Sequence, residues 1–192
     1  MPILPGGLTL PRTGHERTSP VNLRLVSTTI AVALSVMLLG TGIYESVVVA
    51  PNLQGAPSSL EYARGFYHAT NPGMFFRVLA PGTQFFLLLA LVCNWAPIPL
   101  TRWRLAGALA LALLGDLVTF KFHYPRNTIL FSGSLTLPAA DLDRVAREWA
   151  LGNYVRIALI FTAVVLVMVS MIRIARDTAP GEHRYSSSAG AR

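Results

Sequence analysis

The chain has few charged side chains and a single cysteine among its 192 residues. Charged residues make up 13% of it, whereas a soluble domain has roughly 25%. Cys93 by itself excludes an intramolecular disulfide and a cysteine-based metal cluster within one chain. Basic residues exceed acidic ones, for a net charge of +7, but they form no run that would indicate a nucleic-acid-binding face.

Long apolar stretches dominate what is present, and 53% of the residues are hydrophobic. Each of four stretches is long enough to cross a hydrocarbon layer of about 30 Å as a helix. We therefore predict an all-α fold, a four-helix transmembrane bundle over 25–172, with flexible tails at 1–24 and 173–192. The predicted spans are 25–49, 74–95, 105–123 and 151–172.

The connections between these spans differ in length. Residues 50–73 contain two prolines and then a polar, aromatic stretch that predicts one short amphipathic helix. The next connection, 96–104, is short, and the third, 128–148, ends in a helix start near Pro138 or Ala139 that would run into the last span. Pro81 is expected to be tolerated inside span two, whereas Pro125 is expected to end or kink span three.

The arginines favour one orientation. Because cytoplasmic segments carry the excess of Lys and Arg, we predict that both termini are cytoplasmic, in a plasma or bacterial inner membrane. Neither half of the sequence repeats the other, which disfavours a repeat-built transporter. The arginines then on the inner side are Arg12, Arg17, Arg24, Arg102, Arg104, Arg173, Arg176, Arg184 and Arg192.

Three ionisable residues interrupt the apolar runs: Glu45, Asp116 and Arg156. A charge at membrane depth is costly, so each is a functional candidate. Glu45 and Arg156 are expected at similar depth in the outer half. They either form a buried ion pair that holds two helices together or line a cavity as an acid and a base.

Further polar residues share helical faces near the same end. Thr119, His123 and Asn127 follow a spacing of four residues, and Trp149 and Asn153 form another such stripe. Tyr44 lies beside Glu45. We take Glu45, His123 and Arg156 as candidate catalytic residues. The candidate substrate-binding residues are Tyr44, Asn127, Trp149 and Asn153. Trp149 also fits an interfacial aromatic belt, and Lys121 and Arg126 are expected to extend towards the outer headgroups.

A metal site is chemically conceivable but is not required by the spacing. His68, His123 and Glu45 have ligand types that suit zinc, iron or copper. The sequence lacks HExxH, paired CxxC motifs and two histidines four residues apart, so we assign no metal ligands, and the cofactor is left unknown. His123 as a general base or as a hydrogen-bond donor to a small molecule is the simpler assignment.

The stretch His123-Tyr124-Pro125-Arg126-Asn127, then Arg147-Glu148-Trp149 and Asn153-Tyr154-Val155-Arg156, resembles the anthrone oxygenase-like family of small four-span membrane proteins. Val49-Ala50-Pro51 and Phe75-Phe76 also resemble it. Family members often carry a histidine a few residues before the last arginine, whereas this chain has Asn153. The resemblance implies that His123 or Glu45 would deprotonate a planar phenolic substrate from the bilayer. The resulting anion would react with oxygen, with Arg156 and Asn153 stabilising the developing charge.

Three function classes follow. The first is a cofactor-independent or metal-assisted oxygenase of a lipophilic phenol, with an apolar aromatic small molecule as its partner. The second is a non-catalytic membrane subunit that contacts partner helices or a second copy through small residues such as Gly107, Ala110 and Leu114. The third is a carrier of a small solute or lipid. A ligand-sized cavity around the polar residues would favour the first or third class, and its absence the second.

Overall fold

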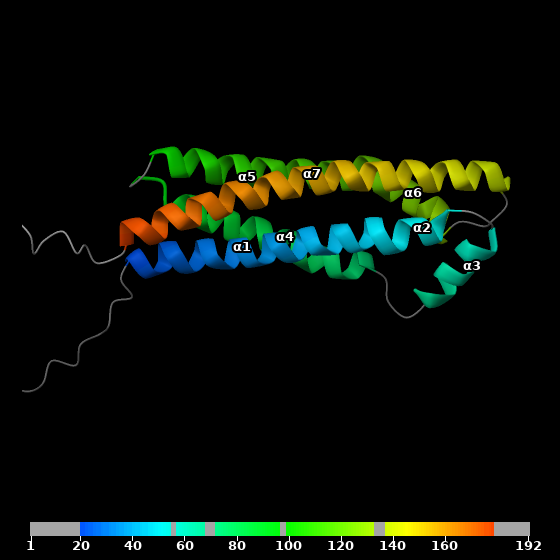
Figure 1. Cartoon of the computed structure of the whole chain (residues 1–192), viewed down its shortest axis with the longest axis horizontal. Helices are drawn as coiled ribbons and strands as arrows, with labels where there is room; N and C mark the ends of the chain where they lie inside the picture. The colour runs from blue at the N-terminus through cyan, green and yellow to red at the C-terminus, as the bar shows by residue number, and fades with distance from the viewer. Residues whose placement is uncertain (1–19, 55–56, 68–71, 97–98, 133–136, 179–192) are drawn as a thin grey trace, which may run out of the picture.

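The computed structural model describes residues 20–54, 57–67, 72–96, 99–132 and 137–178. Four long helices run lengthwise beside one another, which confirms the predicted all-α bundle (Figure 1). Each is long and apolar enough to cross a membrane: Leu23–Leu53, Gly73–Cys93, Pro99–Phe131 and Ala139–Thr178. The chain is therefore an integral membrane protein by the length and composition of its helices.

Two of the spans are built from several helical segments. The first comprises α1 (Pro20–Tyr44), a π-helical turn (Glu45–Val49) and α2 (Ala50–Leu53). The third comprises α5 (Pro99–Val118), a π turn (Thr119–His123), α6 (Tyr124–Asn127) and a further π turn (Thr128–Ser132). The second and fourth spans are single helices, α4 (Pro72–Cys93) and α7 (Ala139–Thr178). Helix α4 continues through Pro81, and α7 starts at Ala139, as the sequence predicts.

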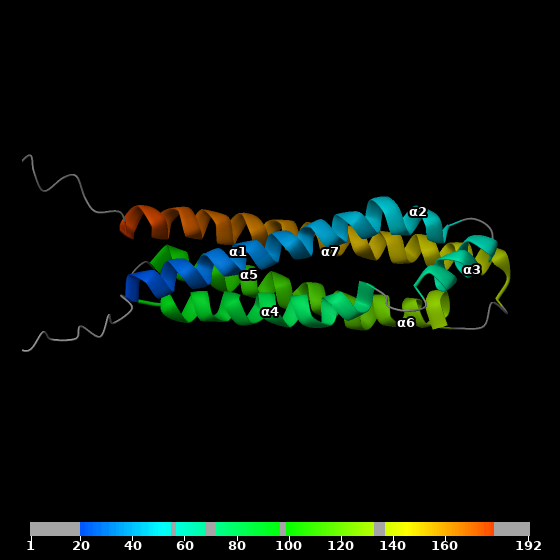
Figure 2. The same cartoon turned by 90° about the horizontal axis from the view of Figure 1, so that it is seen from below.

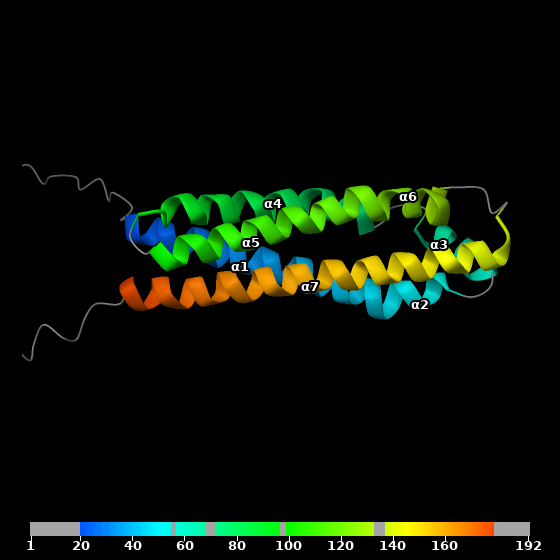
Figure 3. The same ribbon diagram turned by 90° about the horizontal axis from the view of Figure 1, so that it is seen from above.

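The four spans form a closed ring. Helix α7 packs against α1 and α5, and α4 packs against the same two helices from the opposite side (Figures 2 and 3). Helix α1 begins and α7 ends at one end of the bundle, here the terminal end (Figure 1). The short helix α3 (Pro57–Phe66) lies at the other, the α3 end. The cytoplasmic assignment of the terminal end stays a prediction.

The buried apolar residues form three clusters along the described bundle. The terminal core contains Ala31, Ala90, Ala108 and Ala163 with larger neighbours, and such small residues let helices approach closely. A middle core joins Leu38, Leu79, Ile160 and Val164. At the α3 end, a third core joins Val49, Leu53, Leu60, Ala63, Leu130, Leu142, Val145 and Trp149, with nearby alanines. Helix α3 is thus packed onto the bundle and closes its end.

The outward surface is largely apolar. Val36, Leu113, Leu117 and Phe161 are between 46% and 56% exposed on different helices, as expected of side chains that face lipid. The predicted stripe of small residues is divided. Gly107 packs within the chain, where an added Cβ would lie 3.4 Å from Leu166, whereas Leu114 is exposed, as is Ala110. The stripe is therefore not one continuous exposed face.

Pro125 does not end the third span, and Pro51 does not end the first. In each case a π turn comes just before the proline: the N–H of Ala50 donates to the oxygen of Glu45, and the N–H of Tyr124 donates to that of Thr119. A π turn adds one residue to the helical circuit. The proline then falls in the first turn of the next segment, where a missing N–H is tolerated. The same device occurs twice and carries Glu45 and His123.

Candidate functional site

A cavity of about 690 Å³ lies between the middle core and the core at the α3 end. All four spans contribute to its wall, together with Arg64 and Tyr67 from α3 and the residue after it. Volumes of about 300–1,000 Å³ are typical of small-molecule sites. The polar side chains in its wall are Glu45, Arg64, Tyr67, Arg77, Asp116, Thr119, His123, Tyr124, Asn127, Thr128, Trp149 and Arg156.

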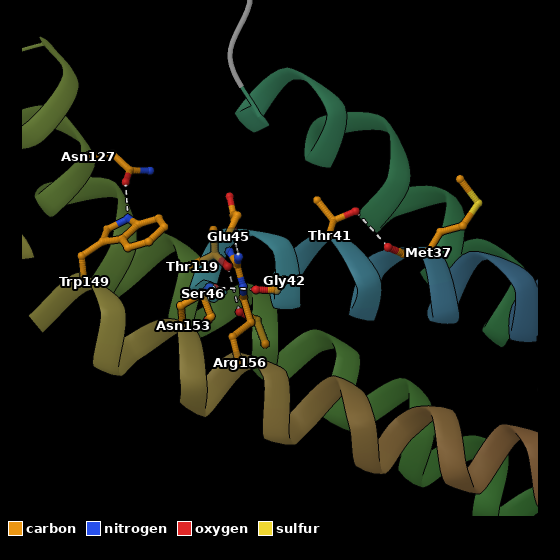
Figure 4. A network of polar contacts seen from close by, with 11 residues as sticks. Met37, Thr41, Gly42, Glu45, Ser46, Thr119, Asn127, Trp149, Asn153 and Arg156 are labelled. Atoms are coloured by element: carbon orange, nitrogen blue, oxygen red, sulfur yellow. Dashed lines mark hydrogen bonds and ion pairs between the residues drawn. The ribbon is translucent and has the colours of Figure 1, made fainter. Parts of the chain in front are cut away.

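Glu45 and Arg156 form an ion pair at the cavity wall, with Arg156 Nη2 donating to Glu45 Oε2 (Figure 4). Their side chains are only 8% and 13% exposed. The guanidinium carbon of Arg156 also lies 4.9 Å from the ring centre of Phe76, a cation–π arrangement. The two groups pair across the first span and α7 and also line the cavity, so the ion pair of the first alternative is present, and a role as acid and base stays a prediction.

Asp116, the third intramembrane charge, has a different partner. It accepts a hydrogen bond from Gln84 Nε2 of α4 and lines the same cavity. Thr119 lies one turn further along and returns its hydroxyl to Gly115 O at 3.0 Å. The chain thus brings both intramembrane carboxylates, the buried Glu45 and the half-buried Asp116, to one cavity and provides each with a donor from another helix.

His123 is 1% exposed and lines the cavity, and neither of its ring nitrogens makes a well-formed hydrogen bond. The imidazole approaches the backbone of Gly152, where an added Cβ would lie 3.3 Å from Nε2. Its ring packs edge-on against Trp149, with centroids 5.4 Å apart. The two ring nitrogens are themselves enclosed and one lies near the Gly152 backbone, so a ligand in the cavity uses their donor and acceptor capacity only after a local shift of the imidazole.

Trp149 and Asn127 are joined by a hydrogen bond set apart from the Glu45–Arg156 ion pair (Figure 4). Trp149 Nε1 donates to Asn127 Oδ1 at 2.7 Å, and Trp149 is 4% exposed. The indole is therefore held by the protein, more firmly than an aromatic belt at a lipid interface would require. The amide nitrogen of Asn127 keeps its two N–H groups as donors beside the cavity.

A second contact crosses the wall behind His123. Arg126 donates to Glu148 Oε2 at 2.7 Å and to Phe122 O at 3.0 Å, and its guanidinium lies 3.5 Å from the Phe122 ring centre. Arg126 is thus bound by an acid of α7, and the expectation that it extends towards headgroups stays a prediction. Phe122 occupies the space that a side chain at Gly152 would need.

Two of the proposed substrate-binding residues lie outside the cavity wall. Asn153 is fully buried and donates to Gly42 O at 3.1 Å and Ser46 Oγ at 2.8 Å, so it joins α7 to the first span (Figure 4). Tyr44 is 50% exposed and lines a second cavity of about 450 Å³ between the first span and α3. Sequence spacing identified their faces but not what those faces contact.

Arg64, Tyr67 and Arg77 line the cavity without having been singled out in the sequence. Arg64 donates to Leu130 O at 2.8 Å and Ile129 O at 3.0 Å, which ties α3 to the third span. Burial, helped by Tyr44 and Glu45, raises the pKa of the Tyr67 phenol, so this group stays neutral. The polar, aromatic stretch around 58–73 was the available signal, but it could not show that this helix covers a cavity.

The described residues contain no group of three or more His, Cys, Asp or Glu side chains that could hold a metal ion. His68, considered above with His123 and Glu45, lies outside the described residues. The arrangement that remains is an imidazole, two carboxylates and several cationic or amide donors around an apolar-walled cavity. Such a set can bind an aromatic molecule, accept a proton from it and stabilise an oxyanion.

No protein-family model matches the chain, and comparisons with curated proteins and with solved structures give no match either.

Proposed function

We propose that this membrane protein binds a lipophilic aromatic molecule of the anthrone type in the 690 Å³ cavity and promotes its oxidation by dioxygen. The observation that carries the proposal is the buried, unpaired His123 in the wall of a ligand-sized cavity, with Arg156 and Asn127 in the same wall. The resemblance of 123–127 and 147–156 to anthrone oxygenase-like proteins supports the choice of substrate class.

The first role belongs to His123. A neutral imidazole can accept the proton that leaves the activated CH2 group of an anthrone. The flat substrate would pack beside Trp149, whose orientation the hydrogen bond to Asn127 maintains. The wall also contains Phe76, Leu38 and Ile160, so a bound aromatic substrate would displace water from these apolar side chains and contact fixed polar groups.

The second role is charge stabilisation. Loss of the proton leaves an anion delocalised onto the carbonyl oxygen, and N–H donors from Arg156 and Asn127 would stabilise that oxygen. The carbanion forms a C–O bond with dioxygen, and loss of water leaves a new carbonyl. One oxygen atom enters the product and the other leaves as water, so dioxygen is the only oxidant needed. Glu45 positions Arg156 through their ion pair.

A fluorescence titration tests binding. In the W95F/W103F variant, Trp149 is the only tryptophan, so a bound aromatic molecule should quench it directly. Anthrone turnover is followed by oxygen uptake and quinone absorbance. We expect saturable quenching and turnover with the starting protein. His123→Gln should keep binding and reduce turnover by about 100-fold or more.

Thr162→Val is the matched control, because Thr162 is exposed and bonds only to Ala158 O of its own helix. It should leave quenching and turnover unchanged. Quenching without turnover would favour the carrier. No quenching by any anthrone-like molecule would contradict the proposal and favour a non-catalytic subunit, in which Glu45–Arg156 and Asp116–Gln84 serve only to join helices.

A further inference from the structure

Arginines from two spans approach the same turn at the terminal end of the bundle. Arg24, near the start of α1, donates from Nε to Asn94 Oδ1 at 2.9 Å. Asn94 and Trp95 continue the last turn of α4. Arg102 of α5 lies over Trp95, with its guanidinium carbon 5.7 Å from the ring centre. The guanidinium of Arg24 from α1 therefore contacts Asn94, and that of Arg102 from α5 contacts the neighbouring Trp95.

Several donors of this group have no acceptor. Arg24 Nη2, Arg102 Nε and Arg104 Nη1 are buried and have no hydrogen-bond partner among the described residues. The hydroxyl of Thr101, a fully buried residue, is also unpaired. A buried N–H without an acceptor is costly, and more so on a charged group. Arg24 and Arg102 contact the end of α4, and Thr101 and Arg104 are placed near them only by their positions beside Arg102 in the first turns of α5. We call these four side chains the arginine cluster, and their unpaired donors have no acceptor in the described chain.

The backbone favours the same kind of ligand. Helix α5 begins at Pro99, immediately before the cluster, and its first turn contains no acidic residue. The N-terminus of a helix presents unpaired N–H groups and a partial positive charge, which attract an anion. Within the described ranges, the carboxylate at this end is that of Asp177, which is exposed on α7 and forms no ion pair.

We propose that the arginine cluster, Arg24, Thr101, Arg102 and Arg104, binds a phosphate group, in the form of an anionic phospholipid headgroup. Each guanidinium carries five N–H groups, and phosphate oxygens can accept several of them at once when the arginine side chains turn their enclosed donors outwards. Trp95 and Trp103 flank Arg102 and are 55% and 66% exposed. Tryptophan prefers the headgroup level of a bilayer, so these two residues place the cluster where lipid phosphates lie.

The test uses the delipidated full-length chain in mild detergent, with bound lipid counted by native mass spectrometry. Phosphatidylglycerol should bind at least about tenfold more tightly than phosphatidylcholine of the same acyl chains. The R24Q/R104Q variant should lose this preference. The matched R173Q/R176Q variant removes equal charge from exposed positions on α7 at the same end and should keep it.

Equal binding of the two lipids would overturn the proposal, as would equal weakening by the two double variants, since charge alone would then explain binding. If R24Q/R104Q does not fold, Arg102→Gln, which leaves the Arg24–Asn94 bond intact, gives the same comparison. Competition with inorganic phosphate shows whether the site recognises a free phosphate ion or only the headgroup of a lipid. Displacement of the lipid supports a phosphate site open to water, and retention supports a site that requires the whole lipid.

Discussion

The two halves of the bundle differ in how most of their buried polar side chains are bonded, although Arg24–Asn94 also crosses between two spans at the terminal end. Towards the terminal end and the middle, Ser35, Thr83 and Ser170 return their hydroxyls to the carbonyl four residues earlier in the same helix. Towards the α3 end, polar contacts cross between spans, as in Arg156–Glu45 and Asn153–Ser46, whose partners are more than 100 residues apart in sequence. Local bonds leave helices free to pack closely, whereas crossing bonds hold them around a cavity.

The two halves also differ in how closely their helices pack. Alanines at 31, 90, 108, 112 and 163 pack together in the terminal core. In the α3 half, π turns at Glu45–Val49 and Thr119–His123 widen two spans and turn a carboxylate and an imidazole inwards. Tight packing of small residues therefore stabilises one half, and polar crosslinks add to the apolar core of the other.

Removal of one member of the ion pair should have the largest effect. Glu45→Ala leaves the Arg156 guanidinium, 13% exposed, without its counter-charge. We expect a loss of about 3–5 kcal/mol in unfolding free energy, measured by thermal or denaturant unfolding in detergent. The E45Q/R156Q variant, which removes both charges, should be less destabilised. If the single variant is as stable as the starting protein, crosslinks do not stabilise this half.

The second largest effect is expected from added side-chain volume, which should destabilise the terminal core more than the cavity wall. Ala108 is fully buried between α5 and its neighbours, so Ala108→Leu should cost about 1–3 kcal/mol. Ala80→Leu adds the same atoms at the cavity wall and should cost less, while it weakens binding of an anthrone-type ligand. Unfolding and Trp149 quenching are measured for both. Equal destabilisation by the two changes would mean that the cavity does not accommodate added volume.

The Gly152–Phe122 contact tests the support behind His123. A Cβ at position 152 would collide with the Phe122 ring and lie 3.3 Å from His123 Nε2. Gly152→Ala should therefore cost about 1–3 kcal/mol and reduce turnover, because the imidazole must move. Gly40→Ala is the control, since no atom lies within 4 Å of its added Cβ. Similar stability and turnover for both variants would contradict this packing.

The smallest effect is expected at Trp149. Trp149→Phe removes the 2.7 Å hydrogen bond to Asn127 but keeps an aromatic ring. A loss of about 0.5–1.5 kcal/mol is expected for the bond itself, and ligand affinity should fall as the ring loses its fixed orientation. Calorimetric titration with an anthrone-type ligand measures affinity without tryptophan fluorescence. Unchanged affinity would show that the indole does not position the ligand.

Much of the site could be predicted from the sequence because charges are rare in apolar runs. Glu45, Asp116 and Arg156 were evident for that reason, and the spacing of Thr119, His123 and Asn127 placed them on one face that the cavity now contacts. Arg64 and Tyr67 gave no such signal, because they follow a connection whose path over the bundle depends on long-range contacts. Asn153 and Tyr44 were singled out in the sequence but lie outside the cavity wall. The position of a residue on a helix face does not show which neighbouring element that face contacts.

The sequence alone determined that four apolar helices span a membrane, because the length and periodicity of each run depend only on local residues. It also determined which polar residues must find partners inside the bundle. Only the tertiary structure decided that Glu45 pairs with Arg156, that Asp116 pairs with Gln84 and that His123 stays unpaired beside a cavity. Those outcomes depend on the order of helices in the ring and on two π turns that continue the helices past their prolines, and neither is encoded by any one segment.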